Sequence, residues 1–262
     1  YVGHYQHQLY SPMTSANIIV QAINAFRDAY LYTGDIKYGR AGAILIDRIA
    51  DVYPSYDLRP YPAYQNSHGG TNTGKILGSI WETDISRDFS LAYDAFYPAF
   101  DDPQVIDYLS KKATQYKLDN PKTSGNMIRE NCEDGILREV IEAVKTARVR
   151  GNFGMHQYSM AAAAVALDTL PETSDAIDWL GKATSPSKVT VTQFGKEYTA
   201  YSSNSGGEFL VKFLTDVDRD GFGNEVGVGY NQSWLTNSLN AAEILSRYER
   251  YQALDLYSNP KY

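Results

Sequence analysis

Four side chains that can handle anions and protons lie close together in the stretch RVRGNFGMHQ, residues 148–157. Arg148 and Arg150 precede Asn152, and His156 follows it by four positions. Guanidinium groups attract an anion, an amide donates hydrogen bonds without adding charge, and an imidazole exchanges protons near neutral pH. The pattern predicts an anion site beside a group that can move a proton.

The glycines and the following helix support this prediction. Gly151 and Gly154 flank Asn152, and glycine allows a ligand to approach the backbone closely. Apolar periodicity predicts a helix over 154–168, whose first N–H groups and positive dipole end face the loop. A structural interpretation is also open, in which the arginines complement the dipole of the preceding helix and His156 only packs.

A second cluster is the stretch DVDRDGFGNEVGVGYNQSW, residues 216–234. Asp216, Asp218 and Asp220 resemble the front half of a calcium loop, but the twelfth position is Gly227 rather than an acidic residue. A tight turn and a structural calcium ion are therefore both open interpretations. Tyr230 follows three glycines in what the pattern predicts to be a loop, where a tyrosine has no evident packing role.

A third group of candidate residues lies at the end of the stretch GGTNTGKILGSIWE, residues 69–82. Trp81 can serve as a platform for a sugar ring or as a core residue, and Glu82 follows it directly.

Composition narrows the function classes. The chain has 262 residues with a formal net charge of −7, and it shows no basic stripe of the kind that binds nucleic acid. A single cysteine, Cys132, excludes an internal disulfide framework. No apolar run reaches the length of about 18 residues that a transmembrane helix needs, so no membrane partner is expected. The 22 tyrosines suit both helix packing and sugar stacking.

Hydrophobic periodicity predicts an all-α fold of antiparallel helix hairpins in one domain spanning 1–262. Such hairpins stack in an arc or close into an incomplete (α/α) toroid. Alternation over 187–203 predicts a small β-hairpin excursion. The expected helices cover 14–32, 35–52, 74–96, 103–118, 126–148, 154–168, 172–182, 207–214 and 233–251.

The order of these segments resembles the (α/α)-toroid part of the heparinase II/III-like polysaccharide lyases, a group that includes alginate lyases. The resemblance runs over roughly 14–245 and rests on YLYTGDIKYGRAGAILIDRIADVYP, GKILGSIWE, RGNFGMHQYSMAAAAVALD and VDRDGFGNEVGVGYNQSW. It implies a secreted or periplasmic enzyme that cleaves an acidic polysaccharide without a required cofactor. The family's C-terminal β-sandwich, which packs on the toroid, is absent from these 262 residues, so we expect a longer lyase.

The resemblance also implies roles for particular residues. Asn152 matches the asparagine that neutralises the substrate carboxylate, and Tyr230 matches the tyrosine that acts as general acid and sometimes base. The position after the asparagine, where several relatives carry a histidine, is Phe153 here, so His156 is the nearest candidate base. The expected substrate-binding residues are Arg148, Arg150, Trp81, Glu82, Gln157 and Glu225.

Two alternatives remain open at this point. A glycoside hydrolase on a similar helical toroid needs two facing carboxylates, for which Asp84, Asp88, Asp134 and Glu225 are available. A carbohydrate-binding protein without catalysis would use the same cleft and its tyrosines.

Overall fold

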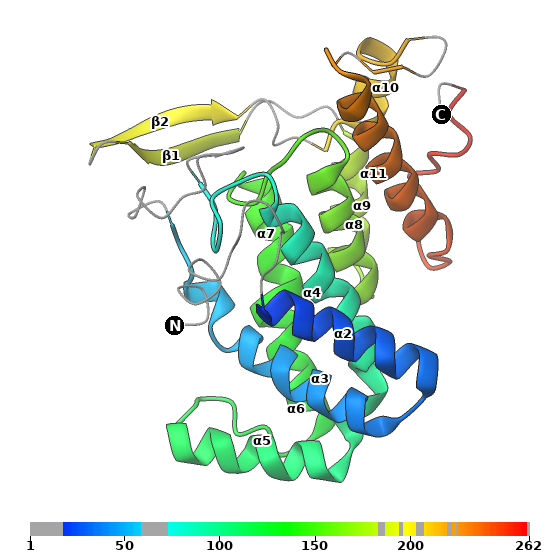
Figure 1. The fold of residues 1–262 in the computed structure, drawn as a ribbon. Coiled ribbons are helices and arrows are strands. Elements are labelled where there is room, and N and C mark those ends of the chain that lie inside the picture. Colours follow the sequence, from blue (N-terminus) through cyan, green and yellow to red (C-terminus); the bar gives the residue numbers. More distant parts are fainter. Residues whose placement is uncertain are drawn as a thin grey trace. The chain divides into compact units, whose positions relative to one another are not determined.

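The computed structural model describes residues 18–58, 73–182, 187–193, 196–202, 207–218, 222–223 and 225–260. Most of these residues lie in helices (Figure 1), which confirms the all-α class. Internal contacts group the chain into two compact units. Unit 1 comprises Tyr1–Tyr56 and Asp88–Glu139, and unit 2 comprises Asp57–Arg87 and Val140–Tyr262. The toroid and the single domain stay predictions.

Unit 1 begins with a helical hairpin of α2 (Ile18–Thr33) and α3 (Ile36–Ala50), which pack against each other. The turn between them fits its sequence, because Gly34 has a φ of +66° and the Asp35 carboxylate accepts a hydrogen bond from the N–H of Lys37. Further elements are η1 (Tyr53–Ser55), η3 (Tyr97–Asp101), α5 (Pro103–Tyr116) and the second half of α4 (Glu82–Phe96).

The predicted helix over 126–148 is a run of three segments. They are α6 (Gly125–Cys132), the π-helical η4 (Glu133–Arg138) and α7 (Glu139–Lys145). Gly135 of η4 lies so close to α3 that a Cβ there would be 2.4 Å from the carbonyl oxygen of Ala50. The run ends at Lys145, earlier than predicted, because Ala147 adopts a φ of +57°.

A buried ionic cluster joins the parts of unit 1. Lys122 is 1% exposed, and its Nζ donates to Asp47 at 2.5 Å and to Asp51 at 2.6 Å. The Asn131 amide donates to both carboxylates at 3.0 Å. The two carboxylates share one lysine, and the amide donates a further hydrogen bond to each of them. This arrangement satisfies charges that would be costly to bury alone.

Unit 2 is built on α8 (Met155–Leu167), which is almost entirely buried and packs against α9 (Glu172–Gly181) and α11 (Val228–Ser246). Its alanines allow the neighbouring helices to approach closely. The short α10 (Phe209–Thr215) lies against α9. Strands β1 (Ser187–Gln193) and β2 (Lys196–Ser202) pair antiparallel, with Ser187 opposite Ser202.

Two helix starts differ from the prediction by about five residues or more, and both differences affect candidate site residues. Helix α4 begins at Glu82 rather than at 74, because the backbone N–H groups of 75–78 bond to the Glu82 carboxylate instead of to helical carbonyls. Helix α11 begins at Val228 rather than at 233. The prediction that Tyr230 lies in a loop was therefore wrong.

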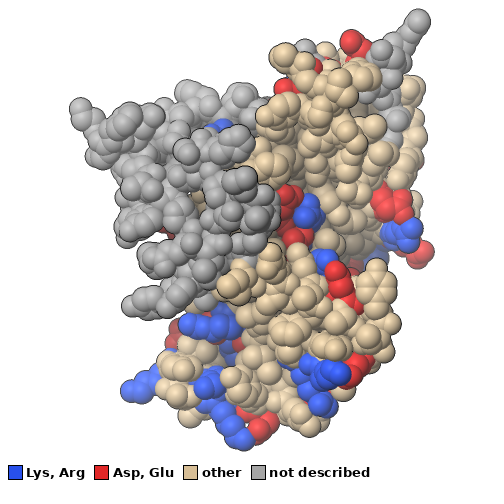
Figure 2. All heavy atoms as spheres, viewed as in Figure 1, with Lys and Arg blue, Asp and Glu red and all other residues tan. Residues whose placement is uncertain are grey.

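The described surface mixes both signs of charge. On the face drawn in Figure 2, acidic and basic side chains lie near one another, and ion pairs such as Lys111–Asp107 and Arg40–Asp102 contribute to this mixture. Among the described residues, no helix is long and apolar enough to cross a membrane.

Candidate functional site

All residues of the predicted lyase site that the structure describes belong to unit 2, whereas Asp88 and Asp134, named for the hydrolase alternative, belong to unit 1. The central one, Asn152, is half-buried in the loop 151–154 that leads into α8. The N–H of Met155 donates to the carbonyl of Asn152 at 3.0 Å and turns the chain into the helix. Asn152 therefore lies at the amino end of α8, where N–H groups without helical partners and the helix dipole favour an anion.

Phe153, next to Asn152, anchors this loop in an aromatic cluster. Its ring is 7% exposed. The ring centroids lie 4.9 Å from Trp234, 5.6 Å from Phe209 and 6.0 Å from Phe213. Tilted and edge-on aromatic pairs of this kind add about 0.5–1.5 kcal/mol each beyond the apolar area that they bury. Phe153 therefore occupies a packing position.

Gly154 lets the loop lie directly on α11. Its φ is +89°, and a Cβ there would be 2.8 Å from Cβ of Asn237 and 3.1 Å from the carbonyl oxygen of Trp234. Only glycine combines this φ with such a close approach at low cost. Two successive residues of the loop, Phe153 and Gly154, therefore fix it against the same stretch of α11.

Tyr230 lies in the first turn of α11, one turn before Trp234, and is 56% exposed. The Asn231 amide donates to the carbonyl of Glu225 at 3.0 Å and to that of Gly227 at 3.3 Å, which ties the entry of the helix to the preceding turn. Residues four apart share a helix face. The contact between Phe153 and Trp234 therefore brings the Asn152 loop and the Tyr230 segment into one neighbourhood.

The first turns of α4 pack beside the same loop. A Cβ on Gly151 would lie 3.2 Å from the methyl group of Thr83. The hydroxyls of Ser86 and Ser159 are 2.8 Å apart, which joins α4 to α8. Trp81 stands just before α4 and is 38% exposed, so its ring remains available to a ligand.

Glu82 holds its own loop rather than facing solvent. It is 1% exposed, and its Oε1 accepts from the N–H groups of Lys75 and Ile76, while its Oε2 accepts from those of Leu77 and Gly78, at 2.7–3.1 Å. Burial raises the pKa of this carboxyl, and the four backbone donors oppose that shift. Both oxygens are fully used, so the geometry favours a structural role over the expected substrate contact.

Gln157 and His156 are also buried, at 1% and 2% exposed. The Gln157 Oε1 accepts from the N–H of Gly154 at 2.8 Å, and its Nε2 donates to the carbonyl of Gly207 at 3.1 Å. Gln157 therefore caps α8 and connects it to the segment before α10. Such use of both amide atoms favours a structural role for Gln157 as well.

The remaining expected ligand-binding residues, Arg148, Arg150 and Glu225, are all partly exposed. Burial lowers the pKa of the Arg150 guanidinium, because removal from water disfavours the charged form. An arginine remains charged at neutral pH despite such a shift. Arg150 therefore keeps the positive charge that an anionic ligand needs.

The aspartates of the predicted calcium loop are only partly described. Val217 and Gly223 form an isolated antiparallel bridge, and Asp216 pairs with Lys212. Asp220 lies outside the described residues. In the described part of the chain, no cluster of three or more acidic, histidine or cysteine side chains is arranged to hold a metal ion.

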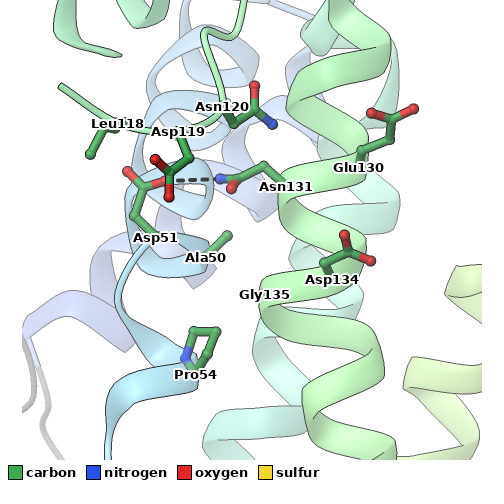
Figure 3. Close-up of a pocket in the computed structure, with 10 residues that line it drawn as sticks. All are labelled: Ala50, Asp51, Pro54, Leu118, Asp119, Asn120, Glu130, Asn131, Asp134 and Gly135. Carbon is green, nitrogen blue, oxygen red and sulfur yellow. Dashed lines mark hydrogen bonds between the residues drawn. The ribbon is translucent and has the colours of Figure 1, made fainter. Parts of the chain in front are cut away.

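Unit 1 contains a cleft of about 460 Å³ that the sequence did not predict (Figure 3). Its walls come from the end of α3 and η1, the loop before Asn120, and the α6–η4 run. Four carboxylates line it, those of Asp51, Asp119, Glu130 and Asp134. The amides of Asn120 and Asn131 line it as well. Asp51 pairs with Lys122, and Asp134 pairs with Arg138 at 2.7 Å.

Comparison with known proteins adds no relative: no family model, curated protein or solved structure matches the chain. Sequence reasoning also missed Trp234, which the geometry makes central to the site. Its position four residues after Tyr230 was a usable signal, but only once the helix is known to begin before Tyr230.

Proposed function

We propose that this chain is a polysaccharide lyase that cleaves a uronic-acid-containing polymer by β-elimination at the Asn152 loop. One observation carries the proposal. The loop with the half-buried Asn152 packs through Phe153 on Trp234, one helical turn from the exposed Tyr230. An amide donor and a phenol in one neighbourhood, with two arginines just before the amide, suit an acidic sugar.

The chemistry requires that a proton leave the carbon bearing the carboxylate. That proton is weakly acidic while the carboxylate keeps its full charge. Hydrogen bonds from the Asn152 amide, aided by the amino end of α8, stabilise the charge that develops on the carboxylate as the enolate forms. The electron pair then forms the carbon–carbon double bond, the glycosidic C–O bond breaks, and the leaving oxygen takes a proton.

The position of Tyr230 suits both proton transfers. Its side chain is 56% exposed, whereas His156 is 2% exposed within α8. A group that exchanges protons between a polymer and the solvent has to be accessible, so this difference favours Tyr230 as the acid and also as the base. In this proposal His156 is a packing residue in the first turn of α8.

The direct test is a screen for the ultraviolet absorbance of an unsaturated uronide. Pectate, alginate, hyaluronan and heparan sulfate serve as substrates for the wild-type chain, Asn152→Ala and Tyr230→Phe. We expect wild-type activity on at least one polymer and losses of about 100-fold or more in each variant. Asn240→Ala and Tyr116→Phe, at exposed positions, are the matched controls and should keep full activity.

His156→Gln separates the two candidate bases. A small loss of activity with unchanged binding supports Tyr230 as the base, while a loss equal to that of Tyr230→Phe supports His156. Absence of absorbance with every polymer contradicts the proposed function. The polymeric substrate also underlies our proposal that the protein is secreted or periplasmic. Our proposal that a β-sandwich domain accompanies this chain in a longer lyase rests on the family resemblance alone.

The unit 1 cleft favours one second candidate, a glycoside hydrolase. Hydrolysis of a glycosidic bond uses two carboxylates, and Glu130 and Asp134 both line this cleft. New reducing ends without ultraviolet absorbance, abolished by Glu130→Gln or Asp134→Asn and not by Asn152→Ala, would favour hydrolysis over elimination.

A further inference from the structure

Trp234 carries a buried hydrogen-bond donor for which the described residues provide no acceptor. The side chain is 8% exposed, and its Nε1–H has no hydrogen-bond partner among the described residues. Ser238 lies one turn later on α11 and is 2% exposed. Its hydroxyl also has no hydrogen-bond partner among the described residues. A buried donor left without an acceptor lowers the stability of the fold, so its presence in a folded protein needs a reason.

The surroundings of this donor indicate the reason. The Trp234 ring lies against Phe153, the neighbour of Asn152. The carbonyl of Trp234 and the N–H of Ser238 lie 3.1 Å and 3.2 Å from the position of a Cβ on Gly154. The unused donor therefore belongs to the same neighbourhood as Asn152 and the amino end of α8. These groups all favour a negatively charged acceptor.

We propose that the Nε1–H of Trp234 donates a hydrogen bond to an anionic oxygen of the bound uronide, beside Asn152. This inference rests on the proposed function, because that function supplies the acidic sugar. In the free protein the donor is buried, and none of the described residues accepts a hydrogen bond from it. On binding it gains a charged acceptor, so the new hydrogen bond increases the affinity for the ligand. Trp234 thus acts as a ligand-binding residue as well as the anchor of the Asn152 loop.

The indole N–H resonance of Trp234 is the most direct readout. The chain has three tryptophans, Trp81, Trp179 and Trp234, and therefore three indole resonances, and Trp234→Phe identifies the relevant one by its loss. Binding is measured in the Tyr230→Phe background, which prevents turnover. The probes are tetrasaccharides of pectate, alginate, hyaluronan and heparan sulfate. We expect the Trp234 N–H proton to move downfield on saturation with the tetrasaccharide that binds.

Affinity measurements separate the donor from the packing of the ring. Trp234→Phe keeps an aromatic ring against Phe153 and removes the N–H. Replacement at position 234 by 3-benzothienylalanine keeps the full bicyclic shape and also removes the N–H. We expect both changes to weaken tetrasaccharide binding about 10-fold to 100-fold, as for other hydrogen bonds to charged groups. The benzothienyl protein should melt no lower than its parent. Trp179→Phe, the same change elsewhere in unit 2, should leave binding unchanged.

The outcomes distinguish this inference from the function on which it rests. Tetrasaccharide binding that depends on Asn152, with an unmoved Trp234 resonance and full affinity in the benzothienyl protein, overturns the inference alone. Binding with the expected shift, but without unsaturated product from the wild-type chain, supports the inference and overturns elimination. If none of the tetrasaccharides binds, both the inference and the proposed function are wrong.

Discussion

The rings of Phe153 and Trp234 pack with their centroids 4.9 Å apart and their planes inclined by 60°. This contact joins two segments that are distant in sequence, the loop before α8 and the first turns of α11. Each segment carries one residue of the proposed reaction, Asn152 or Tyr230. The packing of the loop against α11 should therefore determine how Asn152 and Tyr230 are positioned. Substitutions of single residues in the contact test this.

Gly154→Ala should destabilise the fold by about 1–3 kcal/mol. Alanine is strained at a φ of +89°, and its Cβ would lie 2.8 Å from that of Asn237. Gly229→Ala is the matched control. It is an exposed residue of α11 whose added Cβ meets nothing within 4 Å, so it should be neutral or stabilising by up to about 1 kcal/mol. Urea unfolding measures both, and equal stabilities would contradict this account of the loop.

Glu82→Gln should cost about 3 kcal/mol of unfolding free energy. The carboxylate accepts four backbone N–H groups, and the amide of glutamine would turn a donor toward two of them. Glu130→Gln, at an exposed position of unit 1, should change stability by less than about 0.5 kcal/mol. Thermal unfolding of both variants tests the structural role that we assign to Glu82. Wild-type stability in Glu82→Gln would return this residue to the list of ligand-binding candidates.

Asp47 should make the stability of the fold depend on pH. Burial raises the pKa of Asp47 from 3.8 to about 6, even with Lys122 beside it. The folded chain then binds this proton more tightly than the unfolded chain does. The unfolding free energy should therefore decrease as pH rises from about 4 to about 6, by up to about 3 kcal/mol from this group.

Asp47→Asn removes this contribution and isolates it from other titrating groups. The difference in unfolding free energy between wild type and Asp47→Asn should change across that pH range and stay constant above it. Asp107→Asn, which alters an exposed surface pair with Lys111, should show no such change. Curves for wild type and Asp47→Asn that run parallel from pH 4 to 7 would show that Asp47 titrates as an ordinary carboxyl.

The sequence predicted most of the helices because their cause is local. The turn at Gly34 and Asp35, the start at Pro103 and the alanine-rich α8 follow from capping, proline geometry and apolar periodicity. The start of α4 was missed because Glu82 reaches back to four backbone N–H groups. Helix propensity contains no information about such a contact.

The sequence offered candidate site residues but not their contacts. Residue patterns and the family resemblance singled out Asn152 and Tyr230, whose roles stay predictions, whereas the burial of Glu82, Gln157 and His156 depends on packing between distant segments. The aromatic cluster around Phe153 and the acidic cleft of unit 1 also arise only from tertiary contacts. Sequence patterns can indicate which chemistry is available, while the fold determines which side chains remain accessible to a ligand.

The most direct test of the central claim is a double-mutant cycle in kcat/KM on the preferred polymer. The claim is that Asn152 and Tyr230 act on one acidic sugar, and residues that act as a unit lose activity non-additively. We predict that Asn152→Ala and Tyr230→Phe each reduce kcat/KM by about 100-fold or more. The kcat/KM of the double variant should be close to that of the less active single variant. Losses that simply multiply in the double variant would contradict this account.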